Sequence, residues 1–486
     1  MIPVNHPFEQ LPKQLSKAFT ALKIGQHLRK SGIIKGFGVP CLELFRIVFL
    51  LVFQHKNLFR LLEGGQNEAL PSKDVVYRFL NHSRYAWRKF LLSLSHSVVR
   101  EMTPLTSDQR VRVFIIDDSV YSRNRSKTLE LLARVHDHTT GKFIKGFSML
   151  TLGWSDGFSF VPLDFNLLSS RKPENRLQEM KEVDRRTVGY KRRQEALLSK
   201  PEAVSKLIDH ALDSDIQADY VLMDTWFTQA PLIESIVAKG LAVIGMVKQM
   251  KQRYLHESKM LTLAELYANT SRLQRNKDIQ GSIHVQLAGG LAIKIVFVRN
   301  RNKKRDWLAI LSTDCTLSDE EIVRIYGIRW QIETFFKVTK SYLQLGKEFQ
   351  GRSYDMLVSH TTIVFARYLL LSWQTRQHND AKTIGGMFYL FCDEVKDLDL
   401  KTALQQLWQF IQAFLPKEKS TNSNPVVCQL VQWIATLPSY IKACLPNLSW
   451  SSRRESHGSR PSQIRTCPIK AYGSSYHPLQ SYNDHL

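Results

Sequence analysis

Hydrophobic residues recur along the chain with two different periods, and the change of period divides the chain into regions. Up to about residue 105 they keep helical spacing, as in "YAWRKFLLSLSHSVVREM" (85–102). The pattern changes at "VRVFIIDDSVYS" (111–122), a run of β-branched and apolar residues that predicts a buried strand. "KFIKGFSMLTLGW" (142–154) and "FSFVPLDFNLL" (158–168) predict two more strands joined by a turn. The stretch between the first two strands is expected to be a loop or a short helix.

Further along the chain, strands and helices alternate. "ADYVLMDTWF" (218–227), "APLIESIVAKG" (230–240) and "LAVIGMV" (241–247) read as strand, helix and strand. This order implies a parallel pair of strands with a crossover. Residues 248–318 again have a pattern that predicts strands with polar turns, including a hairpin around Gly289-Gly290. A helix capped by Ser318 follows.

The chain is therefore expected to have a mixed α/β fold between two helical regions. Six segments are predicted: a helical, DNA-binding N-terminal region (1–105), the first part of an α/β core (106–247), a β-rich insertion (248–318), a helix that completes the core (319–345), a C-terminal helical region (346–445) and a disordered tail (446–486).

The net charge points to a polyanionic partner. The 67 Lys and Arg residues exceed the 44 Asp and Glu residues and leave a formal charge of +23. Nucleic acid is the commonest partner for such an excess, and an anionic membrane surface is the competing one. The two most apolar runs (41–53 and 356–373) carry charged or His residues within them, so both are expected to be buried helices rather than membrane spans. No membrane partner is expected.

The six cysteines are scattered without a close pair, which argues against a zinc site and a disulfide framework. A reducing cytoplasm is the expected compartment. Residues 169–200 are densely charged, and they are expected to form either a solvated flexible loop or a contact with phosphates.

One face of the helix predicted over "IYGIRWQIETFFKVTK" (325–340) is cationic and yet holds one carboxylate. Tyr326, Arg329, Glu333, Lys337 and Lys340 share an arc roughly 80° wide at about 100° per residue. A solvated helix with Glu333 paired to Lys337 at i,i+4 would explain this face without any function.

Two other acids stand in positions typical of active sites in α/β folds. Asp117, beside Asp118, is expected to end the first strand, and Asp224 the strand before the crossover helix. Together with Glu333 they form a carboxylate set of the kind that Mg²⁺ or Mn²⁺ prefers. Two such ions can activate an attacking oxygen and stabilise a leaving oxygen in phosphoryl transfer. Each acid alone is a weak signal, since acids are common at strand ends.

"IIDDS" (115–119), "VLMDTWF" (221–227) and the spacing Tyr326-x2-Arg329-x3-Glu333-x6-Lys340 resemble bacterial insertion-sequence transposases of the DDE class, and most closely the insertion sequence four family with its Tyr-Arg-Glu-Lys signature. The resemblance covers about 111–345. It implies an RNase H-like catalytic core that a β-rich insertion interrupts before the third acid.

The resemblance also implies roles for particular residues. Asp117, Asp224 and Glu333 would be the catalytic, metal-binding acids, with Asp118 the alternative to Asp117; related transposases place the first acid two residues before a Ser or Thr, and Ser119 fits Asp117.

The remaining signature positions are expected to bind DNA. Tyr326, Arg329 and Lys340 would hold the transposon end, together with Lys337. Trp307, the Trp of the insertion, is a weaker candidate for stacking on a flipped base. Trp226, beside Asp224, is expected to be a core residue, with a DNA contact as the alternative.

The predicted function is that of a cut-and-paste transposase in the bacterial cytoplasm, associated with the nucleoid. It would cleave double-stranded DNA at terminal inverted repeats, in a step that passes through a hairpin, and join the ends to target DNA as a homodimer on DNA, with two Mg²⁺ or Mn²⁺ ions. The alternatives are another RNase H-like nuclease, such as a resolvase, and an inactive, transposase-derived DNA-binding protein.

Overall fold

The computed structural model describes residues 11–414, apart from residues 12, 64–69, 106, 108–109, 138–139, 251, 271–277, 301–302, 304–305 and 378–381. The described residues up to 403 belong to one compact unit, and those from 404 belong to a second. The tail predicted over 446–486, and the end of the predicted C-terminal helical region, lie outside the described residues.

Short helices make up the first hundred residues, as the helical spacing predicts. They are α1 (Lys13–Ala21), α2 (Ile24–Lys30), α3 (Cys41–Leu50), α4 (Leu58–Glu63), α5 (Lys73–Leu80), α6 (Trp87–Met102) and the 3-10 turn η1 (Thr103–Leu105). Apolar side chains at helical spacing bury one side of each longer helix, and α3 is buried along almost its whole length. The apolar run at 41–53 is therefore a core helix.

A mixed sheet of eleven strands runs through the described residues, and it includes the strands expected from the alternating patterns. Its strands are β1 (Val113–Ser122), β2 (Ala133–Asp137), β3 (Lys142–Ser155), β4 (Phe160–Leu168), β5 (Tyr220–Met223), β6 (Ala242–Val247), β7 (Arg253–His256), β8 (Lys259–Thr262), β9 (Ile279–Gln286), β10 (Ala292–Arg299) and β11 (Trp307–Ser312). Their order is β2-β3-β1-β5-β6-β11-β10-β9-β7-β8, with β4 also paired to β3.

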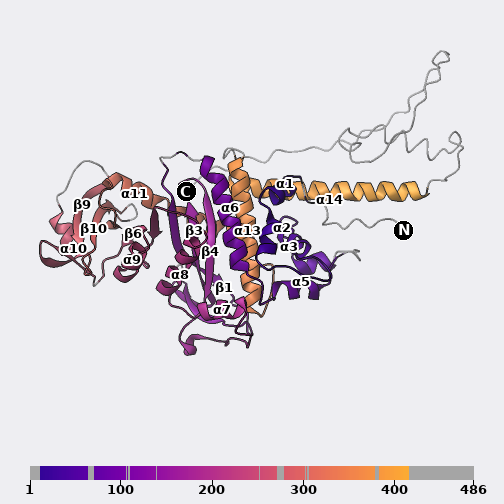
Figure 1. The fold of residues 1–486 in the computed structure, drawn as a ribbon, viewed down its shortest axis with the longest axis horizontal. Coiled ribbons are helices and arrows are strands. Elements are labelled where there is room, and N and C mark those ends of the chain that lie inside the picture. Colours follow the sequence, from indigo (N-terminus) through magenta and orange to yellow (C-terminus); the bar gives the residue numbers. More distant parts are fainter. Residues whose placement is uncertain are drawn as a thin grey trace, which may run out of the picture. The chain divides into compact units, whose positions relative to one another are not determined.

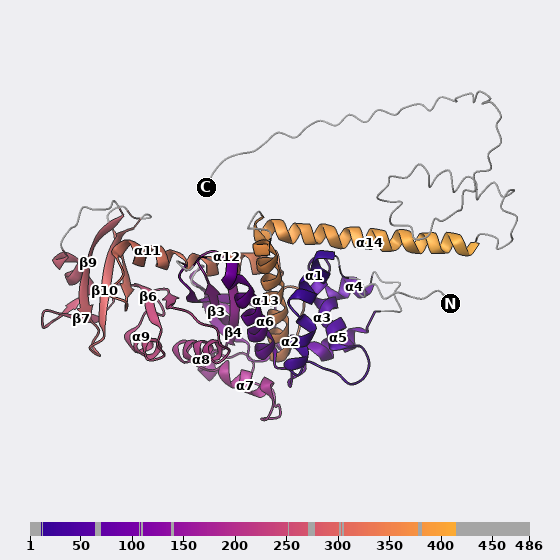
Figure 2. The same cartoon turned by 45° about the horizontal axis from the view of Figure 1, so that its top comes forward.

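The core of this sheet has the arrangement of an RNase H-like domain. β1 pairs antiparallel with β3 and parallel with β5, and β5 pairs parallel with β6. The predicted crossover is present, because α9 (Ala230–Val237) joins the parallel strands β5 and β6. Strands β7–β11 continue the same sheet beyond β6, and β9 and β10 form the predicted hairpin (Figure 2).

Helices cover this sheet and link it to the N-terminal region. The remaining elements are η2 (Pro173–Asn175), α7 (Val188–Glu195), α8 (Lys200–Leu212), α10 (Leu263–Asn269), α11 (Asp319–Gly327), α12 (Trp330–Ser341), α13 (Tyr354–Gln377) and α14 (Ile384–Phe414). α6 and α13 pack against each other and against β4 (Figure 1). α13 also contacts α3 and α5, so the N-terminal helices share a core with the sheet.

α13 is long and apolar enough to cross a membrane, but its apolar window is wholly buried inside the protein. It is a core helix, as the polar residues within the run at 356–373 indicate. Arg367 lies at its centre and is 0% exposed, with its guanidinium bonded to Glu348 and to backbone carbonyls.

Three local expectations are wrong. The stretch between β1 and β3 holds a further strand, β2, because its alternating residues pair with the start of β3. The charged stretch 169–200 is not entirely a solvated loop, because it contains the helix α7 and the buried residues Arg192 and Arg193. Arg193 donates to Glu130 and Asp355, which offsets the cost of burying its charge, and Arg192 donates to the Phe165 carbonyl.

The helix predicted over 325–340 is also interrupted. α11 ends at Gly327 and α12 begins at Trp330, and the two residues between them form a turn. Around it the backbone bonds span three residues instead of four, as from the Arg329 amide to the Tyr326 carbonyl (3.0 Å). Tyr326 and Glu333 therefore do not lie on one continuous helix, and the shared arc of about 80° predicted for such a helix does not apply to this pair. The predicted cap at Ser318 is present, since its hydroxyl accepts from the Glu321 amide.

Candidate active site

The sheet register brings two of the predicted acids side by side. β1 and β5 pair from Val113↔Tyr220 to Ile116↔Met223, so the next residues on the two parallel strands are Asp117 and Asp224. Asp224 follows β5 directly, as expected. Asp117 does not end its strand, however, because β1 continues to Ser122 through its pairing with β3.

Arg329 connects the strand acid to the helix acid. Its Nη1 lies 2.9 Å from Asp117 Oδ2, and its Nη2 lies 3.2 Å from Glu333 Oε1. Glu333 therefore pairs with Arg329 one turn back, and not with Lys337 as a purely solvated helix would predict. The Arg329 guanidinium also lies 6.0 Å from the centre of the Tyr326 ring. The turn between α11 and α12 thus places a cation between two carboxylates.

The acids influence one another electrostatically. Burial, together with the charges of Asp224 and Glu333, raises the pKa of Asp117 to about 7 against the opposing effect of Arg329. Burial, with a smaller contribution from Asp118, also raises the pKa of Asp224. Arg329 therefore lowers the pKa of Asp117 but does not outweigh burial and the neighbouring acids.

Asp118 has different partners from Asp117. Its Oδ2 accepts from the Ser148 hydroxyl (2.6 Å) and lies 2.9 Å from Lys200 Nζ. The side chains of neighbouring strand residues point to opposite sides, which explains why only Asp117 reaches Arg329. Asp118, and not Asp117, is among the residues that line the adjoining groove.

That groove, called here the α12 groove, is a cavity of about 1080 Å³ between α12, the end of β1 and the β2–β3 hairpin. Glu333, Lys337 and Lys340 line it from α12, and Lys142 and Lys347 line it from neighbouring loops and strands. Lys337 is exposed, whereas Lys340 is half-buried and its Nζ lies 2.5 Å from Ser119 Oγ. The predicted helix cations therefore share one cavity with three acids, Asp118, Asp137 and Glu333.

Trp307 lies apart from these residues. It packs on the aromatic side chains of the insertion, with its ring stacked on Tyr267 (centroids 4.8 Å apart) and edge-on to Phe297 (5.1 Å). The structure brings together the other predicted residues, from Asp117 to Lys340, but not this one. Its stacking partner is a neighbouring tyrosine of the insertion core.

Two side chains near the acids could not be placed from the sequence. Lys200 begins α8 and has its Nζ 4.3 Å from the centre of the Trp226 ring as well as beside Asp118. Trp226 is 39% exposed, so it is not the buried core residue that was expected. Lys200 ends the densely charged stretch 169–200, but no spacing rule connects residues 118 and 200.

Two protein-family models match the chain. A model described as DDE superfamily endonuclease matches residues 48–268, and one described as Transposase DDE domain matches residues 199–370. The matched stretches overlap and together contain Asp117, Asp224 and Glu333. These two matches support a DDE-superfamily transposase. The chain therefore carries a transposase-type nuclease domain that acts on DNA, and this superfamily generally uses divalent metals. A search of the curated proteins gave no match.

The chemistry of the carboxylates suits a divalent cation, but the distances between them in this structure do not. Carboxylate oxygens are the donors that Mg²⁺ and Mn²⁺ prefer, and a bound cation would favour the charged form of Asp117, whose pKa burial raises. Among the described residues, however, no three His, Cys, Asp or Glu side chains approach closely enough to hold an ion. Arg329 stands between Asp117 and Glu333, so binding of an ion there requires the guanidinium to move aside.

Proposed function

We propose that this protein is a cut-and-paste DNA transposase of the insertion sequence four family, with Asp117, Asp224 and Glu333 as its catalytic, metal-binding acids. The observation that carries the proposal is the position of Asp117 beside Asp224 on adjacent strands, with Arg329 between Asp117 and Glu333. Glu333 also lines the α12 groove together with Lys337 and Lys340. The family signature Tyr326-Arg329-Glu333-Lys340 supports the same assignment.

The chain's own residues orient the reacting DNA. Arg329 and Tyr326 lie beside the acids, where they would position a scissile phosphate, and Lys337 and Lys340 would hold phosphates farther along the α12 groove. Bound Mg²⁺ or Mn²⁺, which we expect as two ions, would supply activation of the attacking oxygen and charge stabilisation of the leaving oxygen. Cleavage at both element ends by way of a hairpin, joining to target DNA and a homodimer on DNA remain parts of this proposal.

Asp117 is preferred to Asp118 as the first acid. Asp117 shares Arg329 with Glu333, and it is electrostatically coupled to Asp224. Asp118 is already paired with Lys200. Its place on the groove wall keeps it as the alternative, and separate Asn substitutions of the two residues distinguish them.

The test is cleavage and strand transfer with a labelled duplex that carries the terminal inverted repeat flanking the gene. Wild-type protein with Mg²⁺ or Mn²⁺ should nick the duplex at the repeat and join the end to a plasmid. Cleavage without joining would indicate another RNase H-like nuclease, and binding without cleavage would indicate a DNA-binding relic. Either result would refute the proposal.

A further inference from the structure

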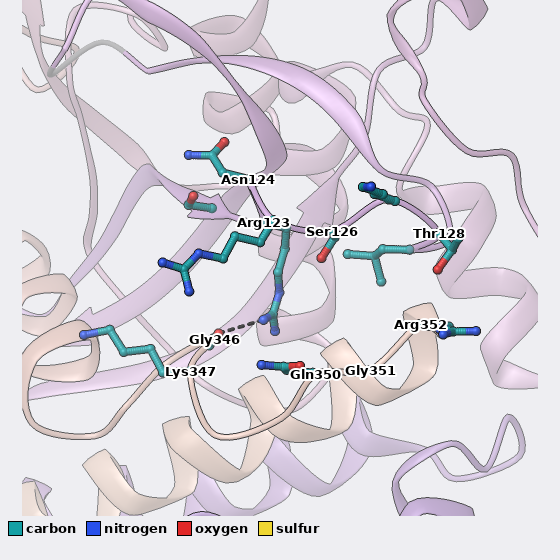
Figure 3. Close-up of a pocket in the computed structure, with 13 residues that line it drawn as sticks. Arg123, Asn124, Ser126, Thr128, Gly346, Lys347, Gln350, Gly351 and Arg352 are labelled. Atoms are coloured by element: carbon teal, nitrogen blue, oxygen red, sulfur yellow. Dashed lines mark hydrogen bonds between the residues drawn. The ribbon is translucent and has the colours of Figure 1, made fainter.

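A second cavity adjoins the α12 groove and carries only positive charges. It has a volume of about 590 Å³ and lies between the loop after β1 and the loop between α12 and α13. The charged residues that line it are Arg123, Arg125, Lys127, Lys347 and Arg352. Figure 3 shows the two loops facing each other, with Lys347 and Arg352 at opposite sides of the space. We call this cavity the β1-loop pocket.

Close contacts between the loops fix the shape of the pocket. Arg123 is half-buried and donates from Nη1 to the Gly346 carbonyl (2.7 Å; Figure 3). Gly346 has a φ of +73°, which favours glycine, and a Cβ on Gly351 would lie 2.1 Å from Met356 Sδ. The pocket walls are therefore held in place before any ligand arrives.

The other four cations are not needed for the fold. Arg125, Lys127, Lys347 and Arg352 are all exposed. Within the part of the chain that the structure describes, none of them is paired with a carboxylate. This separates them from surface arginines such as Arg324, which has Glu321 at 2.6 Å. Like charges collected in one hollow repel one another, and a polyanion there would offset that repulsion.

The pocket is continuous with the α12 groove. Ser122, Asn124, Gly346 and Lys347 line both cavities. A DNA strand with one phosphate beside Glu333 can therefore run along α12, past Lys337 and Lys340, and into the pocket. Lysine and arginine side chains with polar neighbours and backbone groups are the usual contacts to phosphate oxygens.

We propose that the β1-loop pocket is a second DNA site, which holds backbone phosphates of a DNA segment beyond the one at the acids. The inference rests on the proposed function, because it takes the α12 groove as the path of the reacting strand. The same phosphodiester chemistry could come from the element's own end or from target DNA. Its lysines would contact phosphates as point charges and its arginines through two N–H groups at once.

The test is the salt dependence of duplex binding, measured by fluorescence anisotropy in EDTA so that no cleavage occurs. Each phosphate contact adds about 0.9 to the slope of log affinity against log salt concentration. Lys127→Ala/Arg352→Ala should therefore reduce the slope by about 2, and Lys127→Ala alone by about 1. Both residues line the pocket but not the α12 groove. Lys206→Ala, an exposed lysine on α8 outside both cavities, is the matched control and should leave the slope unchanged.

Two duplexes distinguish the sources of the phosphates. A reduced slope only with the terminal-repeat duplex assigns the pocket to the element end, and a reduced slope only with an unrelated duplex assigns it to target DNA. A slope unchanged with both duplexes, in a variant that keeps the wild-type unfolding midpoint, overturns the inference. If the double variant unfolds, the single variants decide in the same way.

Failure of the proposed function has a different signature. In that case wild-type protein would either not cleave the repeat duplex or cleave it without joining the end to a plasmid. Failure of the pocket inference alone would leave wild-type cleavage intact and only the slopes of the variants unchanged.

Discussion

Asp117 and Glu348 are both buried carboxylates that accept hydrogen bonds from an arginine, yet their pKa values shift in opposite directions. Burial raises the pKa of Asp117 to about 7, and Arg329 does not reverse this. Burial alone would also raise the pKa of Glu348, but Arg367 and His360 outweigh it and hold the pKa below its usual value. The difference lies in the neighbours of each carboxylate.

At Glu348 the charges are matched. Arg367 donates to both carboxylate oxygens (2.7 and 3.0 Å), and His360 Nε2 lies 2.6 Å from Oε2. The same guanidinium donates to the carbonyls of Phe49 and Leu343, so it ties α3 to the end of the signature segment. At Asp117, by contrast, Asp224 and Glu333 add negative charge and share one arginine. The cations around Glu348 outweigh the effect of burial on its pKa, whereas Arg329 does not outweigh the effect of burial and of two further acids on Asp117.

The largest effect should follow from removing a carboxylate at the Asp117 cluster. Glu333→Gln keeps the shape of the side chain and removes the negative charge of a proposed metal ligand. Cleavage of the end duplex should therefore fall by at least about 100-fold, the effect expected when reacting groups are misplaced. Binding to the end duplex should survive. Glu320→Gln, an exposed acid on α11, is the control and should cleave normally. Mg²⁺-dependent nicking by Glu333→Gln at the wild-type rate would show that the acid is wrongly assigned.

Removing a carboxylate from the Glu348 cluster should affect the fold instead. Glu348→Gln leaves the fully buried Arg367 without its counter-ion, and breaking such a pair typically costs about 3–5 kcal/mol. Glu63→Gln breaks an exposed pair with Arg60 and should cost no more than about 1 kcal/mol. Urea unfolding of the two variants measures both values. Equal losses would mean that the buried cluster contributes no more than a surface pair.

The two clusters should also differ in the sign of their pH dependence. The pKa of Asp117 in the folded state lies above its unfolded value of about 3.9, so the folded state binds the proton more tightly. The contribution of Asp117 to the free energy of unfolding therefore falls as pH rises from about 4 to about 7. Asp117→Asn removes this loss. In EDTA, its stability relative to wild type should grow over that range and level off above it.

The pH dependence has the opposite sign at Glu348: because its pKa is lowered in the folded state, its contribution to the free energy of unfolding is lost as pH falls. Urea unfolding of wild type and Asp117→Asn at several pH values provides the measurement. A difference independent of pH would show that Asp117 ionises normally.

The smallest expected effect concerns the cations of the α12 groove. Lys337→Ala should weaken duplex binding regardless of sequence and reduce the salt slope by about 1. Lys340→Ala should do the same and also release Ser119. Lys206→Ala again serves as the control. Loss of binding to only one base sequence would indicate base recognition rather than phosphate contact.

The sequence predicts much of the fold because local patterns determine it. Alternating residues indicate β9 and β10, the Ser318 cap marks the start of α11, and apolar runs indicate α3 and α13 as buried helices. Expectations failed where tertiary contacts decide. β2 forms because β3 offers it a partner, and Arg193 is buried because Glu130 and Asp355 accept its bonds.

The site was partly predictable for the same reason. Strand order places Asp117 beside Asp224, and the signature spacing indicates the residues of α12. Nothing in the spacing shows that a turn at Arg329 would place its guanidinium between Asp117 and Glu333, nor that Lys200 would reach Asp118. Such pairings depend on distances between segments that are far apart in the chain.

The most direct test of the central claim is the affinity of the full chain for Mn²⁺, measured by electron paramagnetic resonance of the free ion. If Asp117 and Glu333 belong to one cation site, Asp117→Asn and Glu333→Gln should each weaken binding by at least about tenfold, a change no smaller than that caused by altering residues around metal ligands. Glu320→Gln should bind Mn²⁺ as wild type does. Equal affinity in all four proteins would contradict the account.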